Sequence, residues 1–261
     1  MVQNTFPYLA MAMQVSLSII RYKKRYIPFA LLAMMIFRLP LWFNRDISFY
    51  KLMGSGKNGT FDKRPDLQQW SILTVRSLRF EVRGLKLEVG SLGQDQACLT
   101  KVLYGSFIAG WLKLFGCELW TVLLEPLEGH GQWDGKKVFG ELTDHSVHEG
   151  PIAILTRATI RLSKLKYFWQ QVAPVAAAMK TAKGFVSSVG IGEIPWIKQA
   201  TFSIWQNKEA MKAFAYGMKV HTDVIKKTRD QQWYSEEMFV RFRITANMGS
   251  IRGINPLAGK L

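Results

Sequence analysis

The sequence predicts an α+β protein built from two consecutive β-α-β-β-α-β units. Strand-length and helix-length apolar patterns follow one another in this order in both halves of the chain. Three pairs of local matches in the same order indicate an internal repeat: the glycine pairs Gly54–Gly56 and Gly190–Gly192, then Trp70 and Trp205, then the strand openings Glu118–Trp120 and Glu237–Phe239. Each unit has the ferredoxin-like arrangement. Two such units form a pseudo-dimeric α+β barrel, whose shared interior we expect to be a ligand cavity.

The first half, residues 14–127, opens with a strand at Gln14–Arg21, in which apolar and small polar side chains alternate. A helix with an unusually apolar surface is predicted at Tyr26–Trp42, where Pro28 suits the first turn and Pro40 marks the end. Ser77–Leu92 is compatible with a short helix or a strand pair. The other elements of this half are strands at Ile47–Met53, Trp70–Arg76 and Cys117–Leu124 and a helix at Leu99–Phe115, interrupted by Gly105 and Gly110.

Residues 128–150 are rich in Gly, Asp and His and show little periodicity, which predicts a linker. The second half, residues 151–246, repeats the order with a strand at Ile152–Leu162 and a helix at Ser163–Lys180, for which Ser163 is the expected N-cap. Strands at Phe185–Val189, Gln199–Gln206 and Phe239–Thr245, a helix capped by Asn207 that runs to Gly217, and a helical piece at His221–Glu236 complete the half.

The chain of 261 residues has a formal net charge of +16, which favours anionic partners. The basic residues are dispersed and no nucleic-acid-binding motif is present, so we expect no nucleic acid partner and favour contact with an anionic membrane surface. Met1–Ala10 lacks the basic start of a signal peptide, and Ile27–Phe37 is too short to span a bilayer. We therefore expect a cytoplasmic protein that contacts the inner membrane face peripherally.

His221 is the candidate residue for chemistry. Three of the four histidines lie in the predicted linker, whereas His221 lies in the helical region that should cover the second sheet. Neutral imidazole is a common ligand of haem iron, so His221 is a candidate axial ligand, with a surface or helix-end histidine as the alternative. No Ser-His-Asp order, Walker loop, GxGxxG or HExxH motif is present.

Strand alternation predicts which side chains face the expected cavity. In the last strand Val240, Phe242 and Ile244 should pack beneath helices, which directs Arg241 and Arg243 into the cavity. The isoleucines of Ile152–Leu162 likewise direct Arg157 to the cavity side, and Trp205 shares such a face with two small hydroxyl residues. Buried guanidiniums require anions, and haem propionates would suit them. Pairing with Glu236 or Glu237, or exposure at strand ends, is the alternative.

Several runs resemble one family of enzymes. They are Leu155–Arg161, Gly190–Trp196, Gln199–Trp205 and Trp233–Glu237, with weaker likeness at Phe49–Gly56 and Trp120–Leu127. In these runs the chain resembles spheroidene monooxygenase, the carotenoid ketolase of purple bacteria. The resemblance covers most of Ser48 to Thr245.

The resemblance implies an enzyme that uses haem b and dioxygen to oxidise a methylene of an acyclic carotenoid, or of a similar lipophilic substrate, to a ketone by successive hydroxylations. It also implies that His221, which precedes the Trp-aromatic-x-Glu run, is the axial iron ligand. No flavin or nicotinamide motif is present, so an external electron-donor protein is expected. A cofactor-free monooxygenase or isomerase on the same barrel, and a non-enzymatic haem- or lipophile-binding protein, are the alternatives.

Overall fold

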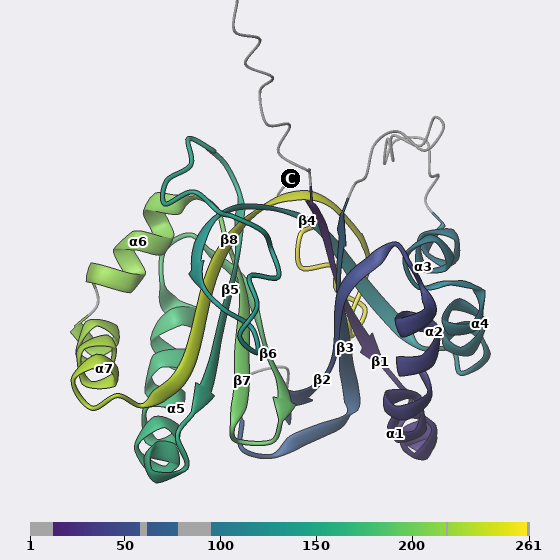
Figure 1. Cartoon of the computed structure of the whole chain (residues 1–261), viewed down its shortest axis with the longest axis horizontal. Coiled ribbons are helices and arrows are strands. Elements are labelled where there is room, and N and C mark those ends of the chain that lie inside the picture. The colour runs from purple at the N-terminus through teal and green to yellow at the C-terminus, as the bar shows by residue number, and fades with distance from the viewer. Residues whose placement is uncertain (1–12, 58–61, 78–94, 218, 260–261) are drawn as a thin grey trace, which may run out of the picture.

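The computed structural model describes residues 13–57, 62–77, 95–217 and 219–259. Within them, eight antiparallel strands form a closed barrel in the order β1-β3-β2-β6-β7-β5-β8-β4, with the helices on the outside (Figure 1). Helices α1–α4 lie on one side of the barrel and α5–α7 on the opposite side. The predicted fold class, an α+β barrel of two ferredoxin-like halves, is confirmed.

The strands are β1 Met13–Arg21, β2 Ile47–Gly56, β3 Pro65–Ser77, β4 Glu118–Gly131, β5 Ile152–Ile160, β6 Phe185–Ile194, β7 Lys198–Trp205 and β8 Tyr234–Gly249. The helices are α1 Ile27–Ile36, α2 Arg38–Phe43, α3 Gln96–Tyr104, α4 Ser106–Leu114, α5 Leu165–Thr181, α6 Lys208–Gly217 and α7 Lys219–Asp230. Nearly all of the unassigned stretch Ser77–Leu92 lies outside the described residues.

The two halves meet at corresponding strands. Strand β2 pairs with β6 at the two glycine runs, where Gly54 lies opposite Gly192, and the hydroxyl of Ser55 donates a hydrogen bond of 2.9 Å to the carbonyl of Gly190. The last strands of the halves, β4 and β8, pair along most of their length. Equivalent strands therefore meet each other at both seams, as expected for an internal repeat with approximate two-fold symmetry.

The shared interior of the barrel is a packed core. Every strand contributes apolar side chains to it, among them Leu17, Leu73, Phe202 and Phe242, all at most 1% exposed. The expectation that the interior is the ligand cavity is therefore wrong. Barrels with eight strands are narrow enough for side chains to fill.

Three local predictions also change. The predicted helix Leu99–Phe115 is two helices that meet at Gly105, whose φ of 87° favours glycine. Ser163 lies in a 3-10 turn before α5 and does not cap it. Strand β4 continues to Gly131, inside the predicted linker, and crosses β8 so closely that a Cβ on Gly129 would lie 2.4 Å from the carbonyl oxygen of Phe239.

Candidate functional site

The outer face of the second-half sheet, formed by β6, β7, β5 and β8, lies beneath α5–α7 (Figure 1). One end of this face is firmly packed. Trp205 of β7 lies against Phe214 of α6, with ring centroids 5.2 Å apart, and Met211 joins the same buried cluster. Asn207 accepts a hydrogen bond of 2.8 Å from the amide of Ala210, so it caps α6 as predicted.

The other end of the face is fixed by a second aromatic group. Trp169 of α5 is buried and donates a hydrogen bond of 3.2 Å to the carbonyl of Trp196. Tyr234 of β8 packs edge-on against Phe168 and hydrogen-bonds the buried Thr228 of α7. Burial raises the pKa of Tyr234 to about 12, so its hydroxyl stays protonated. Helices α5 and α7 are therefore attached to the sheet at this end.

Between these two ends the sheet face is open. Thr156 is exposed although β5 is a central strand between β7 and β8, and its neighbours Thr201 and Phe239 are only half-buried. The 17 residues of α5 include many apolar ones, yet only Trp169 is buried. We call the outward side chains of Thr156, Thr201 and Phe239 the open sheet face.

The first half provides an internal comparison. Its corresponding outer face is packed where α3 and α4 cover it, with Leu103, Tyr104 and Ile108 at most 1% exposed. The buried hydroxyls of Ser18 and Tyr104 lie 2.7 Å apart in a continuous hydrogen-bond network. The outer face of the second half is therefore less closely covered at Thr156 than the first-half face is beneath α3 and α4.

His221 lies in the first turn of α7. Its side chain is outside the described residues, so its predicted role as an iron ligand stays a prediction. Among the described side chains of α7, Thr228 is buried. Thr228 is on the face that contacts the sheet through Tyr234.

Arg241, Arg243 and Trp205 were predicted to face the interior cavity or its rim, but all three lie on the outer face of the barrel, so that part of the prediction is wrong. Val240 and Phe242 fill the interior, and the arginines between and beside them lie on the outer face of β8. Arg243 is half exposed and pairs with Glu125. Alternation separated the two faces correctly, but it could not tell which face is inside, because both sides of a helix-covered barrel are apolar.

Arg241 reaches the open sheet face. Its guanidinium lies 4.8 Å from the ring centroid of Phe239 and forms an ion pair with the buried Glu128. Burial alone would raise the pKa of Glu128, but hydrogen bonds from Lys208 and Arg241 outweigh it and lower the pKa to about 2. The Nε atom of Arg241 is buried and has no hydrogen-bond partner among the described residues.

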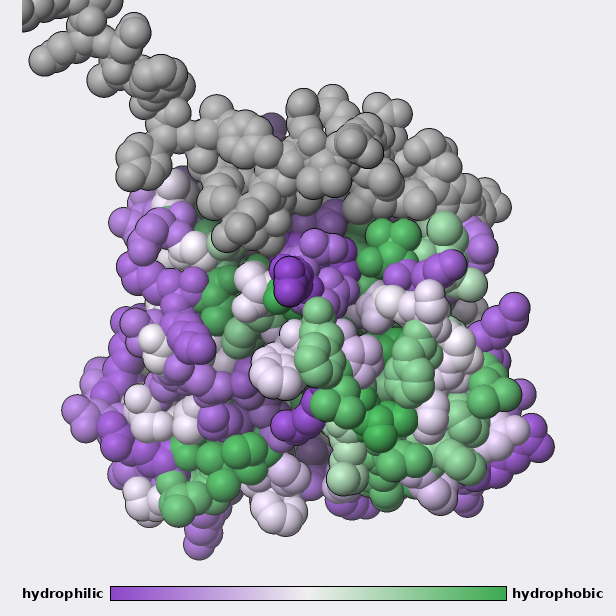
Figure 2. Space-filling view, turned by 45° about the vertical axis from the view of Figure 1, so that its right-hand side comes forward, coloured by the Kyte–Doolittle hydropathy of each residue, from purple (hydrophilic) through white to green (hydrophobic). Residues whose placement is uncertain are grey.

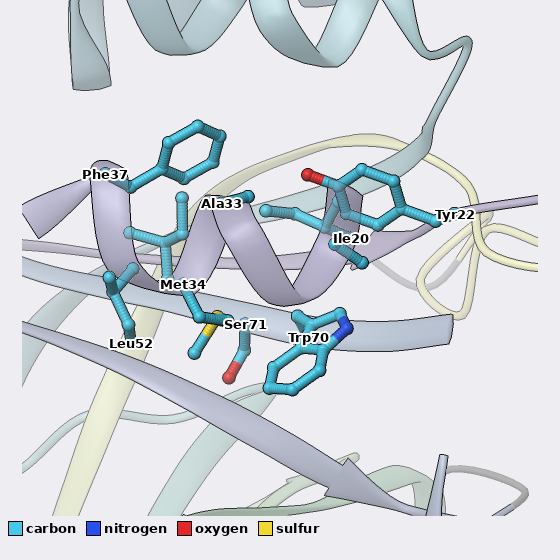
Figure 3. A pocket seen from close by; sticks show the side chains of 10 residues that line it. Ile20, Tyr22, Ala33, Met34, Phe37, Leu52, Trp70 and Ser71 are labelled. Carbon is cyan, nitrogen blue, oxygen red and sulfur yellow. The ribbon is translucent and has the colours of Figure 1, made fainter. Parts of the chain in front are cut away.

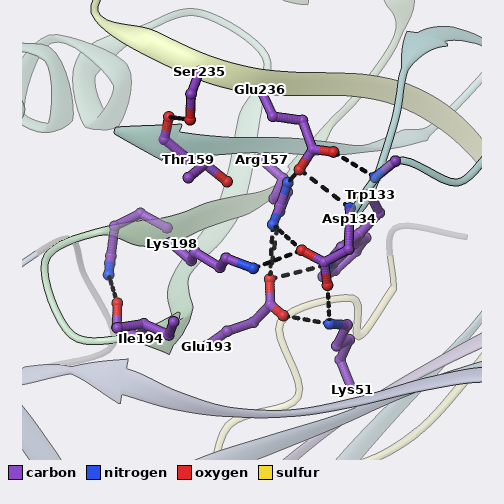
Figure 4. A network of polar contacts seen from close by, with 12 residues as sticks. Lys51, Trp133, Asp134, Arg157, Thr159, Glu193, Ile194, Lys198, Ser235 and Glu236 are labelled. Carbon is purple, nitrogen blue, oxygen red and sulfur yellow. Dashed lines mark hydrogen bonds and ion pairs between the residues drawn. The ribbon is translucent and has the colours of Figure 1, made fainter. Parts of the chain in front are cut away.

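Arg157 faces the barrel interior as predicted, but its partners are carboxylates of the protein (Figure 4). It is 1% exposed, donates to Asp134 at 3.0 Å and to Glu193 at 3.3 Å, and pairs with Glu236. Its guanidinium also lies 5.5 Å from the ring centroid of Trp133. The alternative that Glu236 satisfies a buried arginine is thus the one the structure supports.

Two lysines complete this network. Lys51 of β2 contacts both Asp134 and Glu193 at 2.5 Å, and Lys198 of β7 contacts Asp134 at 2.6 Å. Three cationic and three acidic side chains from β2, β5, β6, β7, β8 and the segment after β4 therefore neutralise one another. Burial opposes ionisation, yet these hydrogen bonds lower the pKa of Asp134. The network closes one end of the barrel, and each guanidinium nitrogen of Arg157 contacts a carboxylate of the protein.

No local pattern in the sequence identifies the open sheet face. Thr156 and Thr201 are ordinary strand residues, and only the contrast between the two halves distinguishes them. Asp134 and Trp133, which join the Arg157 network, lie in the predicted linker. Their proximity to β6 depends on pairing between distant strands, which no local pattern in the sequence reports.

The fold defines a class of two-unit α+β barrel proteins. A solved aldoxime dehydratase in complex with butyraldoxime superposes with a TM-score of 0.59 at 11% identity, covering 96% of this chain and 87% of that chain. A second aldoxime dehydratase gives a TM-score of 0.57 at 9% identity. At such low identity these similarities show the fold alone.

Sequence similarity is more specific. Spheroidene monooxygenase of Rhodobacter capsulatus is 31% identical over 251 residues, which are 94% of this chain and 96% of that protein. The enzyme of the same name from Cereibacter sphaeroides is 32% identical over 214 residues, and the match spans 60% of its length. No family model matches the sequence. The chain belongs to the spheroidene monooxygenase family, a family of oxidoreductases, which confirms the predicted resemblance.

Proposed function

We propose that the protein is a haem-dependent monooxygenase that oxidises a methylene of an acyclic carotenoid, or of a similar lipophilic substrate, to a hydroxyl and then a ketone. The single observation that carries the proposal is the exposed Thr156 on a central strand beneath helices. A sheet surface that the helices of the second half leave partly uncovered is suited to a large flat group. Membership of the spheroidene monooxygenase family supports the oxygenase chemistry.

The residues around the open sheet face fit haem b. Helix α7 carries His221 in its first turn, and the family resemblance implies that its imidazole would be the axial ligand. The unpartnered Nε of Arg241 and the half-exposed Arg243 provide cationic donors for propionate groups. Trp205, packed at one end of the face, would close it on that side. We assign Arg157 no part in haem binding, because its donors are taken by carboxylates.

The apolar side of α5 would hold the substrate and exclude water. Val172, Val175 and Met179 are half-buried, so they offer apolar surface that the folded chain does not itself cover. When bound, haem iron would supply the activation of dioxygen that oxygen insertion at an unactivated methylene requires. The electrons would come from a separate donor protein.

An absorption spectrum of the protein expressed with haem supply tests the cofactor. We expect a Soret band that the His221→Ala variant loses and the matched control His145→Ala, in an exposed loop, keeps. A protein without any Soret band would contradict haem dependence and favour a cofactor-free enzyme. Retention of the band and its position in His221→Ala would contradict the ligand assignment.

Turnover tests the reaction. With a reducing system and dioxygen, the haem-loaded protein should convert an acyclic carotenoid to hydroxylated and then keto products. Chromatography and mass spectrometry would identify these products. Isotope-labelled dioxygen should appear in the product, because a monooxygenase inserts one of its atoms. Haem binding without turnover of any acyclic carotenoid would favour a non-enzymatic binding protein.

A further inference from the structure

The outward side of α1, α2 and the adjoining α4 carries large apolar residues that nothing in the described chain covers. We call this surface the α1–α2 face and define it by Leu31, Met35, Leu39, Trp42, Phe43 and Phe107. Met35 is 70% exposed, and Trp42 and Phe43 are each 71% exposed. Figure 2 shows hydrophobic residues gathered on this side of the molecule. Contiguous apolar surface of this kind marks an interaction site.

These exposed side chains do not belong to the core of the barrel, because α1 packs against the barrel through its other side. Ala33, Met34 and Phe37 face Ile20 and Leu52 of the sheet across a small space beneath the helix (Figure 3). Ala33 and Phe37 are each 2% exposed. The exposed residues of α1 and α2 lie on the opposite side of these helices, so folding of the described chain leaves them in contact with water.

Basic residues border the α1–α2 face at both ends. Lys23, Lys24 and Arg25 are exposed where α1 begins, and Arg45 is exposed just after α2. The segment Lys23–Asp46 contains five basic residues and a single acidic residue, Asp46, which follows Arg45. The combination of exposed aromatic and aliphatic side chains with a basic border is that of an interfacial segment on an anionic bilayer.

The segment lies along a membrane rather than across it. Lys24–Phe43 has 20 residues, contains an 18-residue stretch with a mean hydropathy of 1.7, and is long and apolar enough to span a bilayer. However, its inner side is part of the buried core beneath α1 and α2, which includes Ala30 and Leu41. Spanning would require this packed side to leave the barrel, and Arg38 would enter the hydrocarbon.

We propose that the α1–α2 face is a docking surface for an anionic lipid bilayer, into which Trp42, Phe43 and Met35 insert while the surrounding lysines and arginines contact lipid phosphates. A second copy of the chain fits less well. A symmetric pair would bring together two segments, Lys23–Asp46 of each copy, that each contain five basic residues and one acidic residue. This inference is independent of the proposed reaction.

Vesicle co-sedimentation of the full-length protein tests the surface. Wild type should bind vesicles of equimolar phosphatidylcholine and phosphatidylglycerol at least about tenfold more tightly than phosphatidylcholine alone. Trp42→Ser with Phe43→Ser should lower binding by about 100-fold, because two aromatic side chains no longer leave water. The matched control Leu162→Ser with Ile254→Ser, at residues 71% and 66% exposed elsewhere, should stay within about twofold of wild type.

Equal binding by wild type and the Trp42/Phe43 double variant would overturn the proposal, as would equal binding to the two vesicle types. Resistance of bound wild type to alkaline carbonate would overturn it in favour of a spanning helix. A dimer in solution that the double variant dissociates, without vesicle binding by wild type, would overturn it in favour of a second copy.

Depth of insertion provides a second measurement. Brominated lipids should quench Trp42 fluorescence on binding, and Trp42→Phe should lose most of that quenching while it keeps its affinity, because phenylalanine preserves the apolar contact. Unchanged quenching in Trp42→Phe would show that other tryptophans approach the lipid and would overturn insertion through the α1–α2 face.

Discussion

The arginines of the second half show how strongly one residue type depends on its surroundings. Arg157 and Arg243 both pair with carboxylates, but Arg157 is 1% exposed whereas the side chain of Arg243 is 50% exposed. In the interior an unpaired charge is costly, while at the surface water replaces a lost partner. The two residues therefore contribute very differently to stability.

Removal of Arg157 should destabilise the fold strongly. In Arg157→Met the carboxylates of Asp134, Glu193 and Glu236 lose their shared buried partner, and we expect a loss of about 3–5 kcal/mol in the free energy of unfolding. Urea denaturation measures it, with Arg243→Met as the control at about 0–1 kcal/mol. Equal losses in the two variants would contradict the assignment of the Arg157 network as a structural closure of the barrel.

Low pH should weaken the ion pairs of Glu128 with Lys208 and Arg241. Its pKa in the folded protein is about 2, below the ordinary value of 4.5, so the ionised carboxylate stabilises the fold fully above about pH 4.5. That contribution is lost as the pH falls from 4.5 toward 2. Unfolding free energies of wild type and Glu128→Gln should thus differ most above pH 4.5 and converge toward pH 2. A difference independent of pH would contradict this prediction.

At the scale of elements, alternation and repeat matching predicted the strands and their order well, because each depends on residues close in sequence. The assignment of strand side chains to the inner or outer face of the barrel was correct for some residues and wrong for others. Ile152 and Ile154 do pack beneath helices, but Val240 and Phe242 fill the interior. A barrel covered by helices buries apolar residues on both faces of a strand, so the sequence pattern alone leaves the inside undefined.

The outer sheet faces of the two halves should respond differently to an added aromatic side chain. Thr156→Phe should leave the stability of the haem-free protein within about 1 kcal/mol, since the side chain is exposed. Ser18→Phe, on the first strand of the other half, should cost at least about 2 kcal/mol, because it overpacks the buried contact with Tyr104. Thermal unfolding measures both. A large loss in Thr156→Phe would show that the open sheet face is sealed.

Over the whole molecule, the two halves are one folding unit. The β2–β6 and β4–β8 pairs close the barrel, and the interior core draws residues from both halves. The halves differ in what they present outward: the α1–α2 face on one side and the helices over the open sheet face on the opposite side (Figure 1). A molecule resting on lipid would keep α5–α7 accessible from water, where an electron-donor protein could bind.

An isolated first half, residues 14–127, should not form a stable monomer. Its side of the interior core, including Leu17 and Val122, would be exposed to water along with the unpaired edges of β2 and β4. We expect aggregation or dimerisation on expression, visible by size-exclusion chromatography. A soluble, monomeric and cooperatively folded half would contradict the view that the barrel folds as a unit.

The central claim is that haem binds between the open sheet face and α5–α7, outside the barrel. Haem titration of Thr156→Phe, followed by the Soret band, tests it most directly, with Thr201→Phe as a second variant on the same face. Thr156→Phe and Thr201→Phe should both remain folded and bind at least about 90% less haem than wild type, because a phenyl ring would occupy the space for the macrocycle. Full haem binding by both variants would place the cofactor elsewhere and contradict the account.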